Sequence, residues 1–118
     1  LAPPIQGDGV RIAQVFENLF TNALKYASGA PITISLSFNN EAVTVVFKDG
    51  GPGIPPESLP LIFERFFRAR NEKTVTGSGL GLYICKQIIQ AHRGKIWAES
   101  TPGEGATFYI QLPINPAN

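Results

Sequence analysis

A carboxylate followed by glycines is the first feature of this sequence that could do chemistry. Asp49 ends an alternating apolar stretch, and Gly51 and Gly53 follow it in the segment DGGPG. Because glycine has no side chain, a ligand can approach the backbone there while the carboxylate accepts its hydrogen bonds. Taken alone, the segment is explained equally well as a simple turn after a strand.

A second group of glycines lies in the segment GSGLGL, residues 77–82, directly before and inside a predicted helix start. The free N–H groups of such a start, together with the helix dipole, suit a phosphate. The pattern is not that of a Walker A loop, and Leu82 stands where a dinucleotide fingerprint needs its third glycine. A flexible hinge that feeds a helix is the alternative interpretation.

Basic side chains could neutralise a polyphosphate near these segments. The candidates are Lys25, Arg65, Arg68 and Arg70. Each of them alone is also explained as a solvated surface charge. The phenylalanines at 66 and 67, between the arginines, resemble a nucleic-acid patch, but a net charge of +1 argues against that partner.

The single histidine and the single cysteine do not form a catalytic or metal-binding set. His92 falls in the last turn of a predicted helix, where an interaction with the helix C-terminus explains it, so we exclude it as phosphate acceptor or metal ligand. Neither a zinc site nor a hydrolytic triad is supported by the sequence. Cys85 cannot form an internal disulfide and fits a reducing compartment.

A helix from about Val10 to Ala27 is expected to carry part of any site, because its apolar residues recur at a helical period. Polar residues cluster along one border of its apolar arc: Gln14, Asn18, Asn22 and Lys25. Asparagine favours caps and turns over helix interiors. Two asparagines four residues apart therefore indicate an edge where the core meets an opening.

Two pairs of alternating segments predict two hairpins. Residues 32–38 and 42–49 flank Asn39–Asn40, whose tolerance of positive φ suits a tight turn, and residues 95–100 and 106–113 flank TPGEG. A short helix is expected within residues 57–69 and another helix at 80–92, with a polar loop at 70–79. We therefore expect an α+β fold, a two-layer sandwich with a mixed, mainly antiparallel sheet and about three helices on one face.

Length and composition are those of one globular domain, with 118 residues, 43% of them apolar and 16% charged. No apolar run approaches the roughly 20 residues that a membrane span requires. Because the chain begins at Leu1, we expect it to be a piece of a longer protein.

Four segments resemble, in this order, the motifs of one family. They are ENLFTNALKYA (17–27), the asparagine box; DGGPGIPP (49–56), the first glycine box; IFERFFRA (62–69), the phenylalanine box; and GSGLGLYICKQII (77–89), the second glycine box. Together they resemble the catalytic ATP-binding domain of bacterial two-component sensor histidine kinases, within the Bergerat-fold (GHKL) ATPases. The resemblance runs from about Gly7 to Pro113. It implies that residues 1–118 are a single catalytic domain, with the phosphoacceptor helical domain and the family's first strand lying outside the sequence.

The resemblance also implies the residues of an ATP and Mg²⁺ site. Asn22 would ligate the metal, Lys25 would contact phosphate and Tyr26 would pack beside the nucleotide, while Arg68 would approach the terminal phosphate. Four residues of the second glycine box would form a lid and offer N–H groups to the phosphates: Gly77, Gly79, Leu80 and Gly81.

The other end of the implied site would hold the base. Asp49 would accept a hydrogen bond from the adenine amino group, in a pocket that Gly51 and Gly53 shape and where Ile54 touches the base. Ala106 departs from the family pattern, since relatives often carry Ser or Thr at that place in the closing hairpin.

Asn18 distinguishes the branches of the superfamily. Hydrolysing members carry there a Glu that activates water, a role that an amide cannot take. Glu17 is adjacent, but about 100° further around the helix. The resemblance therefore implies transfer of the γ-phosphoryl group to a histidine on a separate domain, with Asn18, Lys25 and Arg68 as the catalytic positions.

The implied partners are ATP or ADP, the parent protein's own dimerisation and phosphoacceptor domain, and a response regulator. The parent is expected to be a homodimer whose catalytic domain is cytoplasmic, without nucleic acid and without direct membrane insertion. An anti-sigma-type serine kinase, a hydrolysing Bergerat ATPase and a degenerate interaction module are the alternatives.

Overall fold

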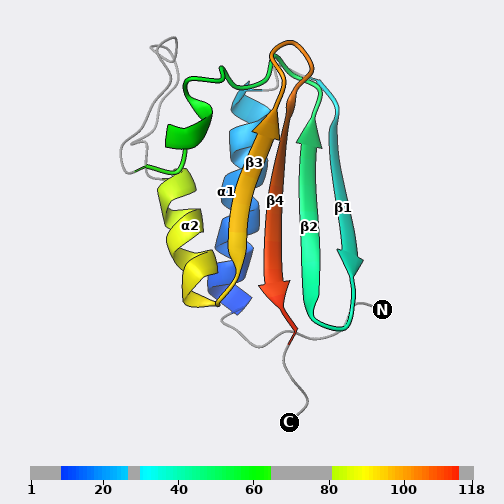
Figure 1. Cartoon of the computed structure of the whole chain (residues 1–118), viewed down its shortest axis with the longest axis vertical. Coiled ribbons are helices and arrows are strands. Elements are labelled where there is room, and N and C mark those ends of the chain that lie inside the picture. Colours follow the sequence, from blue (N-terminus) through cyan, green and yellow to red (C-terminus); the bar gives the residue numbers. More distant parts are fainter. Residues whose placement is uncertain (1–8, 27–29, 65–80, 115–118) are drawn as a thin grey trace.

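The computed structural model of the chain describes residues 9–26, 30–64 and 81–114, without the side chains of residues 22–26. The elements are α1 (Gly9–Tyr26), β1 (Ile32–Phe38), β2 (Ala42–Asp49), the short 3-10 helix η1 (Leu59–Leu61), α2 (Gly81–Ala91), β3 (Lys95–Ser100) and β4 (Ala106–Pro113). The four strands form one layer, and α1 and α2 lie together on one of its faces (Figure 1). The expected α+β two-layer sandwich is confirmed.

The sheet has the strand order β1-β2-β4-β3, and its three described pairings are all antiparallel. Both expected hairpins are present, and the pairing of β2 with β4 joins them. The helix expected at 80–92 is α2. The described part of 57–69, where a short helix is expected, contains the 3-10 helix η1, with Pro60 near its start. Residues 65–69 lie outside the described part of the chain.

The core lies between the helices and the two central strands. Val15 of α1, Cys85 and Ile89 of α2 and Ile110 of β4 are fully buried there. Burial of one aliphatic side chain of this size contributes about 1.5–3 kcal/mol. The alternation in β2, whose odd-numbered residues from Val43 to Phe47 face this core, confirms the pattern expected from the sequence.

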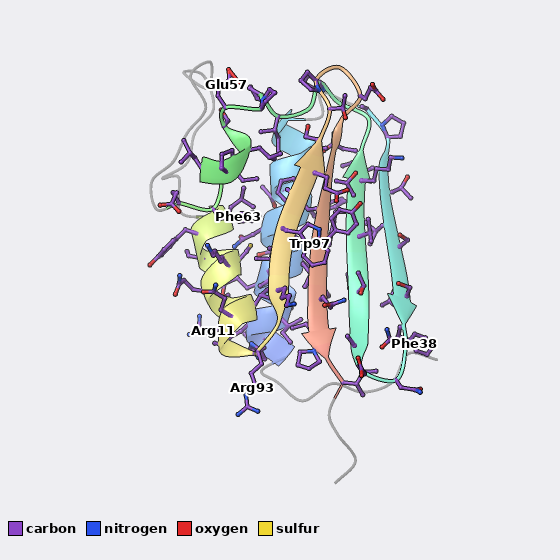
Figure 2. All side chains as sticks on the ribbon, in the orientation of Figure 1. Arg11, Phe38, Glu57, Phe63, Arg93 and Trp97 are labelled. Atoms are coloured by element: carbon purple, nitrogen blue, oxygen red, sulfur yellow. The ribbon has the colours of Figure 1, made fainter. Side chains whose placement is uncertain are left out.

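The opposite face of the sheet carries no helix among the described residues. Trp97 stacks on Tyr109 there, with ring centroids 5.0 Å apart and an angle of 6° between the planes. Figure 2 shows Trp97 on this open face. The Tyr109 hydroxyl donates a hydrogen bond to Glu99 at 2.9 Å, so this aromatic pair is fixed across the β3–β4 hairpin.

The first hairpin turn and the end of α2 have backbone conformations that the sequence did not predict. Asn39 closes the first hairpin with its side chain, because Oδ1 accepts hydrogen bonds from the N–H groups of Glu41 (2.7 Å) and Ala42 (2.9 Å). The expected positive φ in the Asn39–Asn40 turn is wrong, since Arg93 is the one described residue other than glycine with a positive φ. Arg93 ends α2 in the left-handed conformation with a φ of 62°.

The end of α2 also explains two residues singled out in the sequence. His92 Nδ1 lies 2.8 Å from the Ile88 carbonyl, which confirms its role at the helix C-terminus. Gly94 is required by close packing, because a Cβ atom there would collide with the Gln111 carbonyl. Within the described residues, no helix has the length and apolar character needed to cross a membrane.

Candidate functional site

The candidate site lies at the end of the sheet where β2 and β3 stop and β4 begins. Antiparallel pairing brings these ends together, since Lys48 pairs with Thr107 and Ser100 with Ala106. Figure 1 shows the arrowheads of β2 and β3 at the same end of the sheet. Asp49 is the last residue of β2, so its carboxylate stands at this edge.

The Asp49 carboxylate is held by two backbone amides. Its Oδ1 atom accepts hydrogen bonds from the N–H groups of Gly51 (2.9 Å) and Ala106 (3.3 Å). The side chain is 9% exposed and is the one buried polar or charged residue in the described part of the chain. The second oxygen, Oδ2, makes no hydrogen bond to another described residue.

Two loops interlock beside this carboxylate. Gly53 has a φ of 83°, and a Cβ atom there would lie 2.8 Å from the Thr101 carbonyl oxygen. Gly105 has a φ of 91°, and its Cβ atom would collide with the Asp49 carbonyl. The Gly103 N–H also donates to the Pro52 carbonyl at 2.8 Å. These glycines therefore let the loop after β2 pack against the β3–β4 turn.

Ser100 is a residue of this site that sequence reasoning missed. Its hydroxyl oxygen accepts a hydrogen bond from the Ile54 N–H at 2.7 Å and donates one to the Gly105 carbonyl at 3.0 Å. The Ile54 side chain is partly buried against the core. A serine at a strand end has no distinctive pattern in one sequence, so only the folded chain reveals this contact.

Asn18 lies at the seam between α1 and α2. It is half-buried and forms a hydrogen bond with Cys85 of α2. Burial raises the pKa of the Cys85 thiol to about 11, and the hydrogen bond from Asn18 opposes that rise. Cys85 Sγ in turn donates to the Val15 carbonyl at 3.8 Å. Of the polar border predicted on α1, Asn18 therefore faces the second helix.

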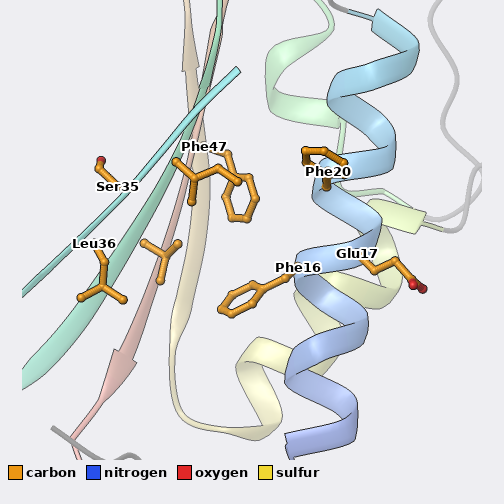
Figure 3. A pocket seen from close by; sticks show the side chains of 8 residues that line it. Phe16, Glu17, Phe20, Ser35, Leu36 and Phe47 are labelled. Atoms are coloured by element: carbon orange, nitrogen blue, oxygen red, sulfur yellow. The ribbon is translucent and has the colours of Figure 1, made fainter. Parts of the chain in front are cut away.

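Glu17, the neighbour of Asn18, is exposed and points away from the sheet (Figure 3). This orientation confirms that Glu17 does not share the face of Asn18. Because Glu17 is the only acidic residue of α1, the helix offers no other carboxylate to activate a water molecule.

The phosphate end of the implied site is described only in part. Asn22, Lys25 and Tyr26 belong to the last two turns of α1, but their side chains lie outside the described residues. The same holds for the whole of Arg68, Gly77, Gly79 and Leu80. Gly81 begins α2 and is exposed, with open space where a Cβ atom would stand. The roles of these residues stay predictions.

A hollow of about 440 Å³ lies elsewhere, between α1 and the β1–β2 hairpin. Figure 3 shows Phe16 and Phe47 directed into it from opposite sides. Its lining is apolar apart from Ser35 and Glu17, and it contains no basic side chain. A polyphosphate would find no compensating charge there, so we do not place the nucleotide in this hollow.

A sandwich with a partly open carboxylate at the strand ends and a helix start on the same face defines a candidate nucleotide-binding domain. The family described as histidine kinase-, DNA gyrase B- and HSP90-like ATPase matches residues 7–116. The chain belongs to this family.

The similar proteins are sensor kinases. Over 114 residues, or 95% of this chain, it is 44% identical to the adaptive-response sensory kinase SasA of Crocosphaera subtropica, covering 30% of that protein. It is 40% identical over the same length to the phytochrome-like protein Cph1 of Synechocystis, covering 15% of it. The chain thus spans less than a third of these relatives.

Solved structures agree. The mycobacterial sensor histidine kinase MprB matches with a TM-score of 0.85 and 33% identity, over 95% of this chain and 78% of that one. The catalytic domain of histidine kinase ThkA matches with a TM-score of 0.81 and 36% identity, over 95% of this chain and 73% of that one. The fold and the family are therefore those of histidine-kinase catalytic domains.

Proposed function

We propose that this chain binds ATP with Mg²⁺ and donates the γ-phosphoryl group to a histidine on a separate phosphoacceptor domain of its parent protein. The observation that carries the proposal is the Asp49 carboxylate, with Oδ1 held by two amides and Oδ2 without a hydrogen bond to the described residues. A carboxylate fixed in this way is an oriented acceptor, which suits recognition of one N–H donor on a ligand. Full-length ShkA, which is 28% identical to this chain, was solved in complex with AMPPNP.

The adenine would lie beside Asp49. Its amino group would donate to Oδ2. Gly51, whose N–H holds Oδ1, and Gly53 would shape the adenine pocket, and Ile54 would touch the base. These four residues all belong to the described part of the chain.

The polyphosphate would extend toward the C-terminal end of α1 and the start of α2. Asn22 would hold Mg²⁺ through its amide oxygen, a ligand that this metal accepts while it keeps several waters. Lys25 and Arg68 would neutralise phosphate oxygens, and Tyr26 would pack beside the nucleotide. Four residues would contribute the lid and its N–H groups: Gly77, Gly79, Leu80 and Gly81. Bound Mg²⁺ would neutralise charge on the phosphates.

Transfer is favoured over hydrolysis because α1 lacks a base at the required position. Asn18 is an amide engaged with Cys85, and Glu17 points away from the sheet. Neither can take a proton from a water molecule beside the phosphates. The base for transfer would come with the acceptor histidine. The parent's dimerisation and phosphoacceptor domain, a response regulator, a homodimeric parent and a cytoplasmic location belong to the same proposal.

Calorimetry and thermal shift with ATP and ADP, with and without Mg²⁺, test the binding step. Nucleotide at about 100 times its Kd would stabilise the fold by about 2.7 kcal/mol. Asp49→Asn should abolish binding, whereas Asn22→Ala should mainly remove the dependence on Mg²⁺. The absence of any stabilisation at millimolar nucleotide would contradict the proposal, and the reverse pattern in the two variants would contradict the assigned roles.

The transfer step is tested by mixing the chain with a separately produced phosphoacceptor domain and labelled ATP. A phosphohistidine is labile in acid, so label that is lost in acid and retained in base is the expected result. Label stable in acid would indicate a serine kinase, and free phosphate without labelled protein would indicate a hydrolase.

A further inference from the structure

Ser100 lies where three parts of the candidate site meet. It is the last residue of β3 and pairs with Ala106 of β4. Its hydroxyl accepts from the Ile54 N–H and donates to the Gly105 carbonyl, at 2.7 and 3.0 Å. Ile54 is 46 residues away in the sequence. One side chain therefore joins the loop after β2 to the β3–β4 turn.

Both partners of this hydroxyl lie next to groups that hold Asp49. The loop that ends at Ile54 also contains Gly51, whose N–H donates to Asp49 Oδ1 at 2.9 Å. Gly105 is followed directly by Ala106, whose N–H donates to the same oxygen at 3.3 Å. The hydroxyl thus links the two segments that supply the amide donors of the carboxylate.

Close packing makes this hydroxyl difficult to replace. A Cβ atom on Gly53 would lie 2.9 Å from Ser100 Oγ, so the loop already passes against it. Ser100 is partly buried. Its hydroxyl donates to the Gly105 carbonyl in the β3–β4 turn and accepts from the Ile54 N–H in the loop after β2. Removal of the hydroxyl would leave the Ile54 N–H and the Gly105 carbonyl without this partner, a costly change where water has little access.

We infer that Ser100 is a positioning residue for the Asp49 carboxylate. It contacts no ligand in this arrangement; it fixes the two amides that hold Oδ1, and by that route it orients Oδ2. The effect of Ser100 on adenine recognition rests on the proposed function. The effect of Ser100 on the Gly51 and Ala106 amides does not, so the two effects are tested separately.

Hydrogen exchange of individual amides tests the positioning without any nucleotide. In Ser100→Ala, the Gly51 and Ala106 amides should exchange about tenfold faster, the change expected when roughly one hydrogen bond's worth of local protection is lost. Amides at the centres of β2 and β4 should keep their rates. Ser100→Thr, which retains the hydroxyl, should restore the protection. Thr101→Ala is the matched control, because it removes a hydroxyl from the adjacent, exposed residue.

Nucleotide affinity tests the consequence for recognition. ATP should bind about three- to tenfold more weakly to Ser100→Ala. The preference for ATP over inosine triphosphate should also shrink, because inosine replaces the amino donor with an oxygen acceptor. Thr101→Ala should change neither quantity.

Unchanged exchange of Gly51 and Ala106 in Ser100→Ala, or equal acceleration of every amide, would overturn the inference. Faster local exchange combined with an intact preference for ATP over inosine triphosphate would keep the positioning of the two amides and overturn its consequence for adenine recognition. Failure of the unmodified chain to bind ATP would overturn the proposed function instead, and the exchange rates would still decide the role of Ser100.

Discussion

Gly105 and Gly103 form a matched pair that tests how the β3–β4 turn supports the site. Both glycines have positive φ, 91° at Gly105 and 84° at Gly103. A Cβ atom at Gly103 would meet nothing within 4 Å, whereas one at Gly105 would collide with the Asp49 carbonyl. Alanine at Gly103 therefore adds conformational strain alone, and alanine at Gly105 adds the same strain and a steric conflict.

The two alanine variants should differ in stability by about 2–3 kcal/mol. A left-handed conformation costs a residue with a Cβ atom about 1–2 kcal/mol, and this term is common to both variants. Forcing an extra carbon into a packed region costs about 1–3 kcal/mol more. The cost at Gly105 should lie at the upper end of this range, because the atom that the new Cβ would meet is a backbone carbonyl oxygen, which cannot move aside like a side chain. Against a total stability of roughly 5–15 kcal/mol, the Gly105→Ala chain should still fold.

Denaturant unfolding followed by Trp97 fluorescence measures the difference, since Trp97 is the only tryptophan. The denaturant slope should be the same in both variants, so that the midpoints report stability. ATP affinity should fall in Gly105→Ala, because the displaced turn carries the Ala106 N–H that holds Asp49. It should stay at the unmodified level in Gly103→Ala.

Gly94→Ala separates lost stability from lost function. Its Cβ atom would collide with the Gln111 carbonyl, at the start of β3 and far from the ends of β2 and β3. This variant should lose stability and keep its ATP affinity once folded. Equal stability losses at Gly103 and Gly105, or weaker ATP binding in all three variants, would refute the reasoning.

Two further predictions concern titratable groups. Burial raises the pKa of the Cys85 thiol from about 9 to about 11, so the folded chain binds this proton more tightly than the unfolded chain. The resulting contribution to the free energy of unfolding is fully present below about pH 9. The free energy of unfolding, measured with denaturant, should therefore fall by about 2–3 kcal/mol between pH 9 and 11. Cys85→Ala should lack this part of the fall. An identical pH profile in both chains would contradict the assignment to Cys85. The Tyr109 pKa is raised because its hydroxyl donates to Glu99. Glu99→Gln should lower the Tyr109 pKa in an ultraviolet titration, and an unchanged value would show that this hydrogen bond does not form in solution.

Periodicity made the core and the hairpins predictable from the sequence. Each of those elements follows from local alternation that one sequence displays, as in β2, where Val43, Val45 and Phe47 turn inward. Asp49 follows the same alternation, because it comes two residues after Phe47 and therefore lies on the same inward face of β2. The alternation of the strand therefore marks this carboxylate as an inward-facing group in the sequence itself.

The contacts between loops could not be predicted in this way. Ser100 meets Ile54 across 46 residues of sequence, and no local pattern marks either residue for the other. The sequence places Gly53 and Gly105 in loops, but it does not show their close neighbours, which are the opposite loop for Gly53 and the Asp49 backbone for Gly105. Such contacts depend on the register in which β2 meets β4, which a single sequence does not display.

That register explains why a hydrophobic core can position a polar site. Phe47 pairs with Phe108, and Lys48 with Thr107, so Asp49 stands one step beyond and opposite Ala106, whose N–H reaches its carboxylate. A slip by one residue would turn every side chain of β2 to the other face of the sheet. It would expose Phe47 and carry Asp49 away from Ala106 at the same time. The packing that excludes water from Phe47 and Phe108 therefore also selects the one register in which the Ala106 N–H holds Asp49 Oδ1.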